Sequence, residues 1–383
     1  MTETDRAALL AEIHASAPLM VMEFAGAGSR ALWWLHSVGG SSRTILEATD
    51  RYAPASLMEA VGFEPRRFTS PEVAAALAGH ARQRAGILAP TAAVFGLGLT
   101  ATIATDRQKR GEHRCEIAVR DGFGTTHYGV TLAKGERDRA GEEELVSELA
   151  IRAVADASGV LGAPLPSLME GEELRLELEA QGPAAEFVRG EREWLLLAPD
   201  GSQGGELPEN AAIFSGSFNP VHRGHLRLAE AASSRLGTPV VFELPLVNAE
   251  KAEIGLEEAR RRAGQFLGHF HLLLTRVPLF SQKARLFSGR TFVVGADTAA
   301  RLLEARFYGS PAARDRAIAE LRDLGARFLV AGRLRDGNFL TLDELDVPEA
   351  SEGMFLSLAE EDFREDLSSS QLRRRWPRPP LSG

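Results

Sequence analysis

The sequence predicts an α/β protein of two domains, the second of them built on a doubly wound parallel sheet. Two observations carry this prediction. The chain has 383 residues, more than one ordinary hydrophobic core accommodates. From residue 211 onward, apolar runs of strand length alternate with helical segments, the pattern of a parallel sheet that helices cover on both faces. The strand-like runs are 211–218, 239–246, 271–276, 291–296 and 326–332.

Helical periodicity fills the gaps between these runs. In doubly wound sheets, ligands bind beyond the carboxyl ends of the strands, at the point where the strand order reverses. The segments that follow the strands are therefore where functional residues are expected. The predicted helices are 225–236, 256–268, 298–307 and 311–324.

The first 160 residues have an α/β pattern of their own. A helix is expected from Pro71 to Arg84, because Ser70 can cap it and proline suits its first position. Residues 92–103 are apolar and glycine-rich, which suits a buried strand in close contact with its neighbours. Residues 115–120 and 125–132 indicate an antiparallel pair.

Residues 161–210 differ in amino-acid composition from both flanking segments. They contain prolines, a block of glutamates and a loop rich in glycine and serine, but no long apolar run. Such a composition predicts a connector with a little structure of its own, including one short apolar strand, rather than a third full domain. The expected division of the chain is therefore 1–160, 161–210 and 211–383.

The composition is that of a globular protein, with 44% apolar and 25% charged residues. A formal net charge of −9 argues against broad electrostatic binding to nucleic acid, which needs a strongly basic face. The single cysteine, Cys115, excludes an intramolecular disulfide and a cysteine-rich zinc site, and its place in a predicted strand favours packing. The sequence shows no apolar signal region and no run of membrane-spanning length, so we expect a cytoplasmic protein.

The most informative segment is Gly216–His225, GSFNPVHRGH, which follows the first apolar run of the second domain and opens a helix. Backbone amides in such a turn, together with the positive end of the helix dipole, form an anion site. Gly216 and Gly224 allow a phosphate or a neighbouring chain to approach closely. His222 and His225 can face the same way across the first helical turn and grip a triphosphate. A tight turn with surface histidines is the alternative that a lone His-x-x-His favours.

Three motifs resemble those of the nucleotidyltransferase superfamily of adenylyltransferases and cytidylyltransferases. Gly216–His225 is similar to its G-x-F-(D/N)-P-x-H-x-G-H signature. Leu367–Arg373, LSSSQLR, is similar to its Ile-Ser-Ser-Thr-x-Ile-Arg motif, whose serines and arginine hold the β- and γ-phosphates. Val294–Thr298, VGADT, resembles the Gly-x-Asp of nicotinate and nicotinamide mononucleotide adenylyltransferases. The resemblance spans about 211–376 and implies a Rossmann-like nucleotidyltransferase domain.

The resemblance also implies the reaction: a phosphate of the acceptor attacks the α-phosphate of ATP in line, and pyrophosphate leaves. Positioning and charge stabilisation supply the catalysis, with Mg²⁺ accompanying ATP and no residue of the chain expected as a metal ligand. The catalytic residues that it implies are His222, His225 and Arg373. The nucleotide-binding residues that it implies are Gly216, Ser217, Phe218, Gly224, Lys251, Gly295, Asp297, Ser368, Ser369 and Ser370.

The identity of the acceptor rests on fewer features. The Gly-Ala-Asp segment and the general layout favour a pyridine mononucleotide, either nicotinate or nicotinamide mononucleotide. The tryptophan-containing substrate loop of the nicotinate enzymes is not evident, since the one tryptophan of this region is Trp376. Lys283 is a weaker candidate than Lys251 for a phosphate ligand, and an exposed lysine is the alternative for both. Two other functions stay open: a cytidylyltransferase with another phosphorylated acceptor, and a regulatory protein that binds nucleotide without turnover.

Residues 15–160 resemble the C-terminal domain of CinA, a nicotinamide mononucleotide deamidase family, in the order and spacing of short motifs. Glu23–Gly28 lies where that family has Glu-Ser-Cys-Thr-Gly-Gly, and Val38–Ser42 resembles its Pro-Gly-Ser-Ser. Gly96–Thr100 lies in the place of its Ser-Gly-Ile-Ala-Gly, and Tyr52 falls on its tyrosine.

The departures from that family concern its chemistry. Phe24 and Ala25 stand where it has serine and cysteine, and Leu57 stands where it has lysine. A hydrolase needs an activated nucleophile and a base, which these side chains do not supply. We therefore expect a deamidase-like domain without deamidase activity, whose glycine-rich loops bind a nucleotide or which drives formation of a homo-oligomer.

Two charged runs have simple structural interpretations. Glu142–Glu144 opens a predicted helix, where acidic residues favour the helix dipole, so a metal site is not expected there. Arg260–Arg262 is expected to form a solvated helix face.

Overall fold

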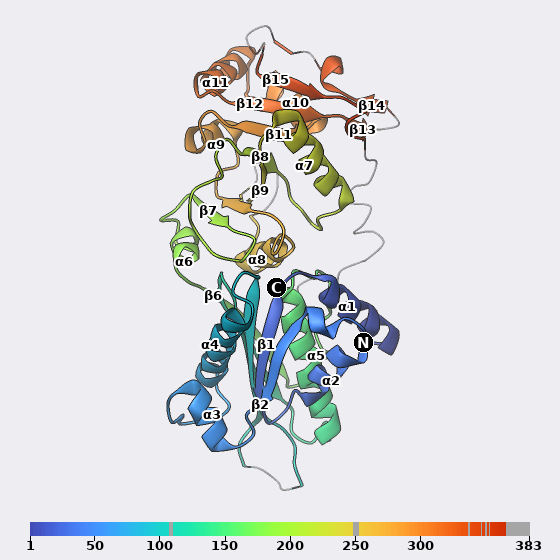
Figure 1. The fold of residues 1–383 in the computed structure, drawn as a ribbon, viewed down its shortest axis with the longest axis vertical. Coiled ribbons are helices and arrows are strands. Elements are labelled where there is room, and N and C mark those ends of the chain that lie inside the picture. The colour runs from blue at the N-terminus through green and yellow to red at the C-terminus, as the bar shows by residue number, and fades with distance from the viewer. Residues whose placement is uncertain are drawn as a thin grey trace.

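The computed structural model describes residues 1–106, 110–247, 253–335, 338–345, 347–348, 351 and 353–364. Two lobes follow one another along the long axis, with the N-terminal half in the lower lobe of Figure 1 and the C-terminal half in the upper lobe. Each lobe is built around a sheet, of six strands in the first and seven in the second. The α/β class predicted from the sequence is confirmed.

The first sheet consists of β1 (Leu19–Ala25), β2 (Ile45–Asp50), β3 (Val94–Thr102), β4 (His113–Arg120), β5 (Gly124–Leu132) and β6 (Glu173–Ala180). Its strand order is β2-β1-β3-β4-β5-β6. β1 pairs in parallel with β2 and β3, whereas β3 to β6 run antiparallel to one another. The hairpin predicted from the sequence is present as β4 and β5.

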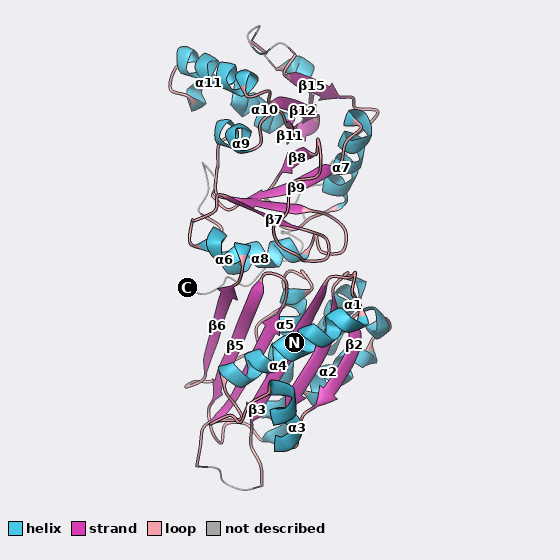
Figure 2. Cartoon of the chain, turned by 60° about the vertical axis from the view of Figure 1, so that its left-hand side comes forward, coloured by secondary structure: helices cyan, strands magenta, loops and turns pink. Residues whose placement is uncertain are grey.

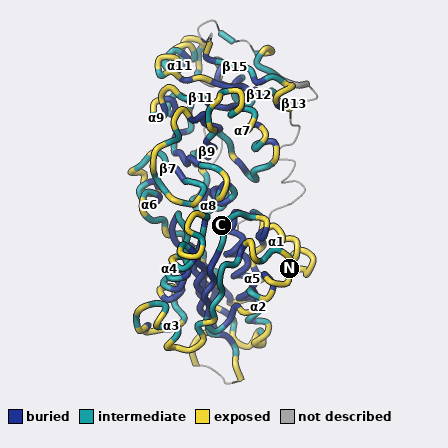
Figure 3. Tube along the Cα trace, viewed as in Figure 1, coloured by how far each residue is buried: buried dark blue, intermediate teal, exposed yellow. Residues whose placement is uncertain are grey.

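Helices cover both faces of this sheet (Figure 2). Met20, Met22 and alternate residues of the other strands share a core with one set of helices, whereas Val21 packs against the opposite set. The strands in the middle of the lower lobe are accordingly buried (Figure 3). The first set is α1 (Glu3–Ala15), α2 (Ser29–Ser37) and α5 (Arg139–Ala157), and the second is α3 (Pro54–Val61) and α4 (Pro71–Leu88), with a short 3-10 turn at Ser41–Arg43.

The glycine-rich stretch of β3 serves helix packing. A Cβ on Gly96 would lie 2.2 Å from the carbonyl oxygen of Ala78, and one on Gly98 would lie 2.3 Å from that of Ala74. Both carbonyls belong to α4, which is capped by the Ser70 hydroxyl as predicted. Glycine is therefore required here because the helix backbone touches the strand backbone.

The second sheet consists of β7 (Trp194–Leu197), β8 (Ala212–Ser215), β9 (Val240–Pro245), β10 (Leu272–Thr275), β11 (Thr291–Gly295), β12 (Arg327–Ala331) and β15 (Phe355–Leu358). Its order is β15-β12-β11-β8-β9-β10-β7, parallel throughout except for β7 at one edge. The chain moves outward from β8 in one direction and then from β11 in the other. This is the doubly wound order, with its switch point between β8 and β11.

Helices again cover both faces. Phe214 belongs to one buried cluster and its neighbour Ile213 to another, so the sheet has a core on each side. A small ribbon of β13 (Arg333–Arg335) and β14 (Asn338–Leu340) follows β12. One face carries α7 (Arg223–Leu236) and α8 (Leu256–Gly264), and the other carries α9 (Phe280–Leu286), α10 (Ala296–Leu303) and α11 (Pro311–Asp323), with 3-10 turns at Ala305–Phe307 and Leu342–Glu344.

The segment 161–210 contributes to both lobes. Its first strand, β6, extends the first sheet beside β5, and β7 extends the second sheet beside β10. Between these strands lies the short helix α6 (Pro183–Val188), whose Phe187 is fully buried in the second core.

The prediction that Arg260–Arg262 forms a solvated face is wrong. α8 lies where the two lobes meet (Figures 1 and 2). The Arg260 side chain is only 5% exposed and forms an ion pair with Asp121, in the turn between β4 and β5. A run of arginines in a sequence is usually solvent-exposed. Here Asp121 of the first lobe pairs with Arg260, so this guanidinium can be buried.

No helix of the described chain is long and apolar enough to span a bilayer.

Cys115 offers a test of the first core. The side chain is fully buried in β4, and burial raises the pKa of its thiol well above the ordinary value. Because the thiolate is the reactive form, we expect native protein to react with a thiol reagent at least about 100-fold more slowly than urea-unfolded protein, a protection of roughly 2.7 kcal/mol. The measurement is the rate of thiol labelling with and without urea. Ala140→Cys, at an exposed position of α5, is the control and should react at once in the native state. Equal rates at Cys115 in both states would contradict its burial.

Candidate functional site

The connection between β8 and α7 places Gly216–His225 at the switch point of the second sheet. β8 has β9 on one side and β11 on the other. The pairing of Phe292 with Ile213 and of Val293 with Phe214 aligns β8 with β11 in parallel, so both strands end at the same edge. This is the edge at which doubly wound sheets bind ligands.

His222 and His225 lie side by side at the start of α7. Their ring centroids are 3.7 Å apart and the ring planes differ by 28°, so the imidazoles stack. They also cap the helix, because the Gly224 N–H donates to His222 Nδ1 and the His222 N–H donates to His225 Nδ1, each at 3.2 Å. With Nδ1 accepting in both rings, each neutral imidazole carries its proton on Nε2, a donor suited to a phosphate oxygen.

The Phe218 ring is buried rather than exposed to a ligand. It is 1% exposed and meets the rings of Phe214, Phe242 and Phe266 edge-on, at centroid distances of 5.5, 5.3 and 5.3 Å. The ring also folds back over Gly216, where a Cβ would lie 2.6 Å from it. Phe218 therefore anchors the loop in the core, and only its main chain is left for a nucleotide contact. Ser217, by contrast, is exposed.

Gly295 and Asp297 lie at the end of the neighbouring strand. Gly295 ends β11 and is the N-cap of α10, and Asp297 lies half-buried in the first turn of that helix. Since β11 is the partner of β8, the VGADT segment and the Gly216–His225 segment leave the sheet at one edge from adjacent strands.

The remaining predicted site residues fall outside the part of the chain that the structure describes. Lys251 lies in 248–252, and Ser368, Ser369, Ser370 and Arg373 lie in 365–383. Their assignment therefore continues to rest on the sequence resemblance.

Lys283 is not the exposed lysine that the sequence allows. Its side chain is 3% exposed, and its Nζ lies 2.6 Å from Glu243 Oε2 and 3.3 Å from Ser215 Oγ. The other carboxylate oxygen of Glu243 accepts from the Thr275 hydroxyl at 2.5 Å. The cluster ties together the carboxyl ends of β8, β9 and β10, and the Gly216 N–H donates to the Glu243 carbonyl oxygen at 2.9 Å. Lys283 thus supports the strand end from which the loop departs.

The first domain contains a cavity of about 230 Å³, lined in part by Ala25, Tyr52 and Leu57, which the sequence resemblance aligns with the deamidase motifs. Arg51 and Arg139 contribute positive charge to its lining and Thr100 a hydroxyl, but among its lining residues there is no serine, cysteine or lysine. Leu57 also lines it, with its side chain packed on Val73. The lining thus offers polar contacts, but not the serine, cysteine and lysine side chains of the motifs that the first domain resembles.

No group of three or more His, Cys, Asp or Glu side chains gathers anywhere in the described ranges in a way that could hold a metal ion. The histidine pair of the second domain has instead the geometry of a hydrogen-bond donor for an anion.

Comparison with known proteins gives a similarity within the second domain. Residues 213–262 match the family described as cytidylyltransferase-like. The match includes most of β8, the histidine pair and most of α8. A protein of Gloeobacter violaceus named "Probable nicotinate-nucleotide adenylyltransferase" is 51% identical over 39 residues, which are 10% of this chain and 19% of that one. The chain thus matches about a fifth of the length of that relative.

Solved structures of the CinA superfamily are similar to part of the fold. A competence/damage inducible protein of Agrobacterium tumefaciens is 15% identical, with a TM-score of 0.33, and the match covers 40% of this chain and 96% of that one. A CinA superfamily protein of Enterobacter cloacae is 13% identical, with a TM-score of 0.34, over 40% of this chain and 90% of that one.

Two residues near the loop were not expected from the sequence. Glu243 stands inside an apolar strand, where a lone charged residue is the signal of a buried partner. Gln265 carries no signal of its own, yet its side chain hydrogen-bonds to the main chain of Phe218 and Val221. Both act on the loop through its backbone.

The buried pair leads to a stability prediction. Replacing Lys283 by methionine leaves the Glu243 carboxylate buried without its cation, so the free energy of unfolding of the second domain should fall by about 3 kcal/mol or more. The measurement is urea unfolding. The control is Arg285→Met, which removes an exposed partner of Glu320 and should cost less than about 1 kcal/mol. Adding Glu243→Leu to the lysine variant should recover part of the loss. A Lys283→Met protein as stable as the parent would show that the pair is not buried.

Proposed function

We propose that the second domain is a nucleotidyltransferase that transfers AMP from ATP to nicotinate or nicotinamide mononucleotide and releases pyrophosphate. The observation that carries the proposal is the stacked pair His222 and His225 at the start of a helix, at the switch point of a parallel sheet. The similarity of residues 213–262 to the cytidylyltransferase-like family supports the reaction class. The name of the Gloeobacter violaceus relative supports the choice of acceptor.

In this reaction an oxygen of the acceptor phosphate forms a bond to the α-phosphorus of ATP. The bond from that phosphorus to the bridging oxygen of the β-phosphate breaks, and pyrophosphate leaves with the electron pair. The Nε2–H groups of His222 and His225 donate hydrogen bonds to phosphate oxygens whose negative charge grows during transfer. The N-terminal end of α7 adds a partial positive charge.

Mg²⁺ would accompany the triphosphate and neutralise charge on it. The chain's own contribution is to orient the phosphates by the loop amides and the two imidazoles.

A second candidate is transfer of CMP from CTP to another phosphorylated acceptor. It is favoured by the description of the matching family, which is cytidylyltransferase-like. Both candidates use the same loop, and they differ in the base and the acceptor.

The purified full chain should release pyrophosphate when incubated with ATP, Mg²⁺ and a pyridine mononucleotide, with the dinucleotide as the second product. The assay compares nicotinate mononucleotide, nicotinamide mononucleotide, phosphopantetheine and glycerol phosphate, each with ATP and with CTP, and identifies products by chromatography. Activity with CTP but not with ATP would contradict AMP transfer and support the second candidate. Nucleotide binding without pyrophosphate from any pair would overturn the transfer reaction.

The two roles of His222 can be separated by substitution. His222→Asn keeps a side chain that caps α7, so the melting temperature should stay close to that of the parent. The variant loses the imidazole donor, so kcat should fall by about 100- to 1000-fold, and His225→Ala should fall by a similar factor. His36→Ala, an exposed histidine of α2, is the matched control and should keep full activity. Unchanged kcat in His222→Asn and His225→Ala would exclude the proposed roles.

A further inference from the structure

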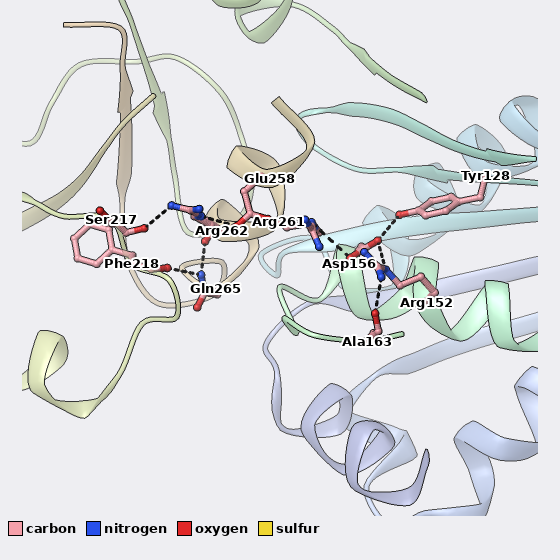
Figure 4. A network of polar contacts seen from close by, with 10 residues as sticks. All are labelled: Tyr128, Arg152, Asp156, Ala163, Ser217, Phe218, Glu258, Arg261, Arg262 and Gln265. Atoms are coloured by element: carbon pink, nitrogen blue, oxygen red, sulfur yellow. Dashed lines mark hydrogen bonds and ion pairs between the residues drawn. The ribbon is translucent and has the colours of Figure 1, made fainter. Parts of the chain in front are cut away.

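The helix α8 touches both domains within one turn. Arg260 forms its buried ion pair with Asp121 of the first domain, and Arg261 lies 4.0 Å from Asp156 at the end of α5. Arg262 points the other way and donates to the carbonyl oxygen of Ser217 at 3.1 Å. Figure 4 shows the contacts from Asp156 of the first domain to Arg261 of α8, and from Arg262 and Gln265 to the loop after β8.

Gln265, directly after α8, holds the same loop at two points. Its amide nitrogen donates to the Phe218 carbonyl oxygen at 3.1 Å, and its amide oxygen accepts from the Val221 N–H at 2.8 Å. One primary amide thus bridges both ends of the 218–221 segment, immediately before His222. Since a second bond ties the same nitrogen to the Arg262 carbonyl at 3.1 Å, the amide is fixed to the end of α8.

The first domain presents a prepared surface to α8. One oxygen of Asp121 accepts from the N–H groups of Phe123 and Gly124, at 2.8 and 3.0 Å, and the other faces Arg260. Although burial lowers the pKa of the Arg260 guanidinium, the nearby Asp121, Tyr128 and Asp156 outweigh that effect and raise it above the ordinary value. Two hydrogen bonds thus hold the hairpin turn, and the positive charge of Arg260 opposite it is permanent.

The remaining contacts at this interface leave α8 little freedom to shift. Asp156 is held by the Tyr128 hydroxyl at 3.1 Å and by Arg152 Nε at 2.8 Å. The backbones of Gly159 and Gly264 meet directly, since a Cβ on Gly264 would lie 2.7 Å from the Gly159 Cα. Phe123 of the hairpin also belongs to the core of the second domain. Any shift of the first domain would therefore move α8.

We propose that the first domain positions the phosphate-binding loop of the second domain through α8, with Gln265 and Arg262 as positioning residues and Asp121 as the docking point. The proposal rests on the proposed function for its catalytic consequence. The structural part, that docking orders residues 216–222, holds or fails independently.

The test has a structural and a kinetic arm on the full chain. In the absence of ligand, Gln265→Ala should speed hydrogen exchange of peptides spanning 216–222 about tenfold or more, because the Val221 N–H loses its acceptor. Asp121→Asn keeps the turn acceptor but removes the charge opposite Arg260, and it should speed exchange of the same peptides. Gln265→Glu keeps the acceptor for Val221 alone and should fall between parent and Gln265→Ala.

Two matched substitutions serve as controls. Gln83→Ala is at an exposed glutamine of α4, and Asp138→Asn is at an exposed N-cap of α5 with the same backbone acceptor role. Neither should change exchange in 216–222. Exchange in β3 reports whether the first domain remains folded in Asp121→Asn.

In the kinetic arm, Gln265→Ala and Asp121→Asn should lower kcat by about 10- to 100-fold with a smaller change in KM for ATP, because a loop displaced by about 1 Å misplaces both imidazoles. If the parent shows no nucleotidyl transfer, the proposed function fails while the exchange data still decide the coupling. Unchanged exchange at 216–222 in Gln265→Ala and Asp121→Asn would overturn the positioning role, whatever the activity.

Discussion

The loop after β8 depends on the burial of one aromatic ring. Phe218 has a φ of 43°, in the left-handed region that costs a residue other than glycine roughly 1–2 kcal/mol. Full burial of a phenylalanine contributes about 1.5–3 kcal/mol, which is enough to hold that conformation. The ring fits only because Gly216 has no side chain, so the glycine of the signature serves the packing of the loop as well as any ligand. The position of His222 and His225 follows from this anchor.

The apolar core stabilises the fold, and two buried ion pairs fix the relative positions of its elements. Lys283 with Glu243 fixes the ends of three parallel strands, and Arg260 with Asp121 fixes one domain against the other. Buried pairs contribute little net stability, because desolvation offsets the attraction between the charges. Their effect is directional, since each charge accepts only a partner at the correct place. The two pairs stabilise the elements that hold the loop, which are the strand ends and α8. They therefore determine where the loop is held rather than what it binds.

Much of the fold can be predicted from local sequence patterns. The buried residues that support the loop, such as Lys283 and Arg260, cannot. The alternation of strands and helices after residue 211 was sufficient to predict a doubly wound sheet, and its order then placed the histidine segment at the switch point. The sequence favoured exposed positions for Lys283 and Arg260, because their partners Glu243 and Asp121 lie 40 and 139 residues away along the chain. A pairing over such distances appears only when the tertiary arrangement is known. For the same reason, the sequence motif does not predict that the Phe218 side chain is buried while Ser217 is exposed.

The first domain also fills its own anion-binding turn. Glu143 of α5 accepts from the N–H groups of Gly28 and Arg30, at 3.0 and 3.1 Å, and from the Ser29 hydroxyl at 3.2 Å. These are the groups at the start of α2 that would otherwise favour a phosphate. A nucleotide could bind at this turn only by displacing an internal carboxylate, and Gly96 and Gly98 are occupied by the backbone of α4. The glycines of these segments therefore serve helix packing and capping. The same helix that supplies Glu143 carries Asp156 near its C-terminal end, against α8. The packing of this helix thus links the core of the first domain to the element that holds the loop of the second.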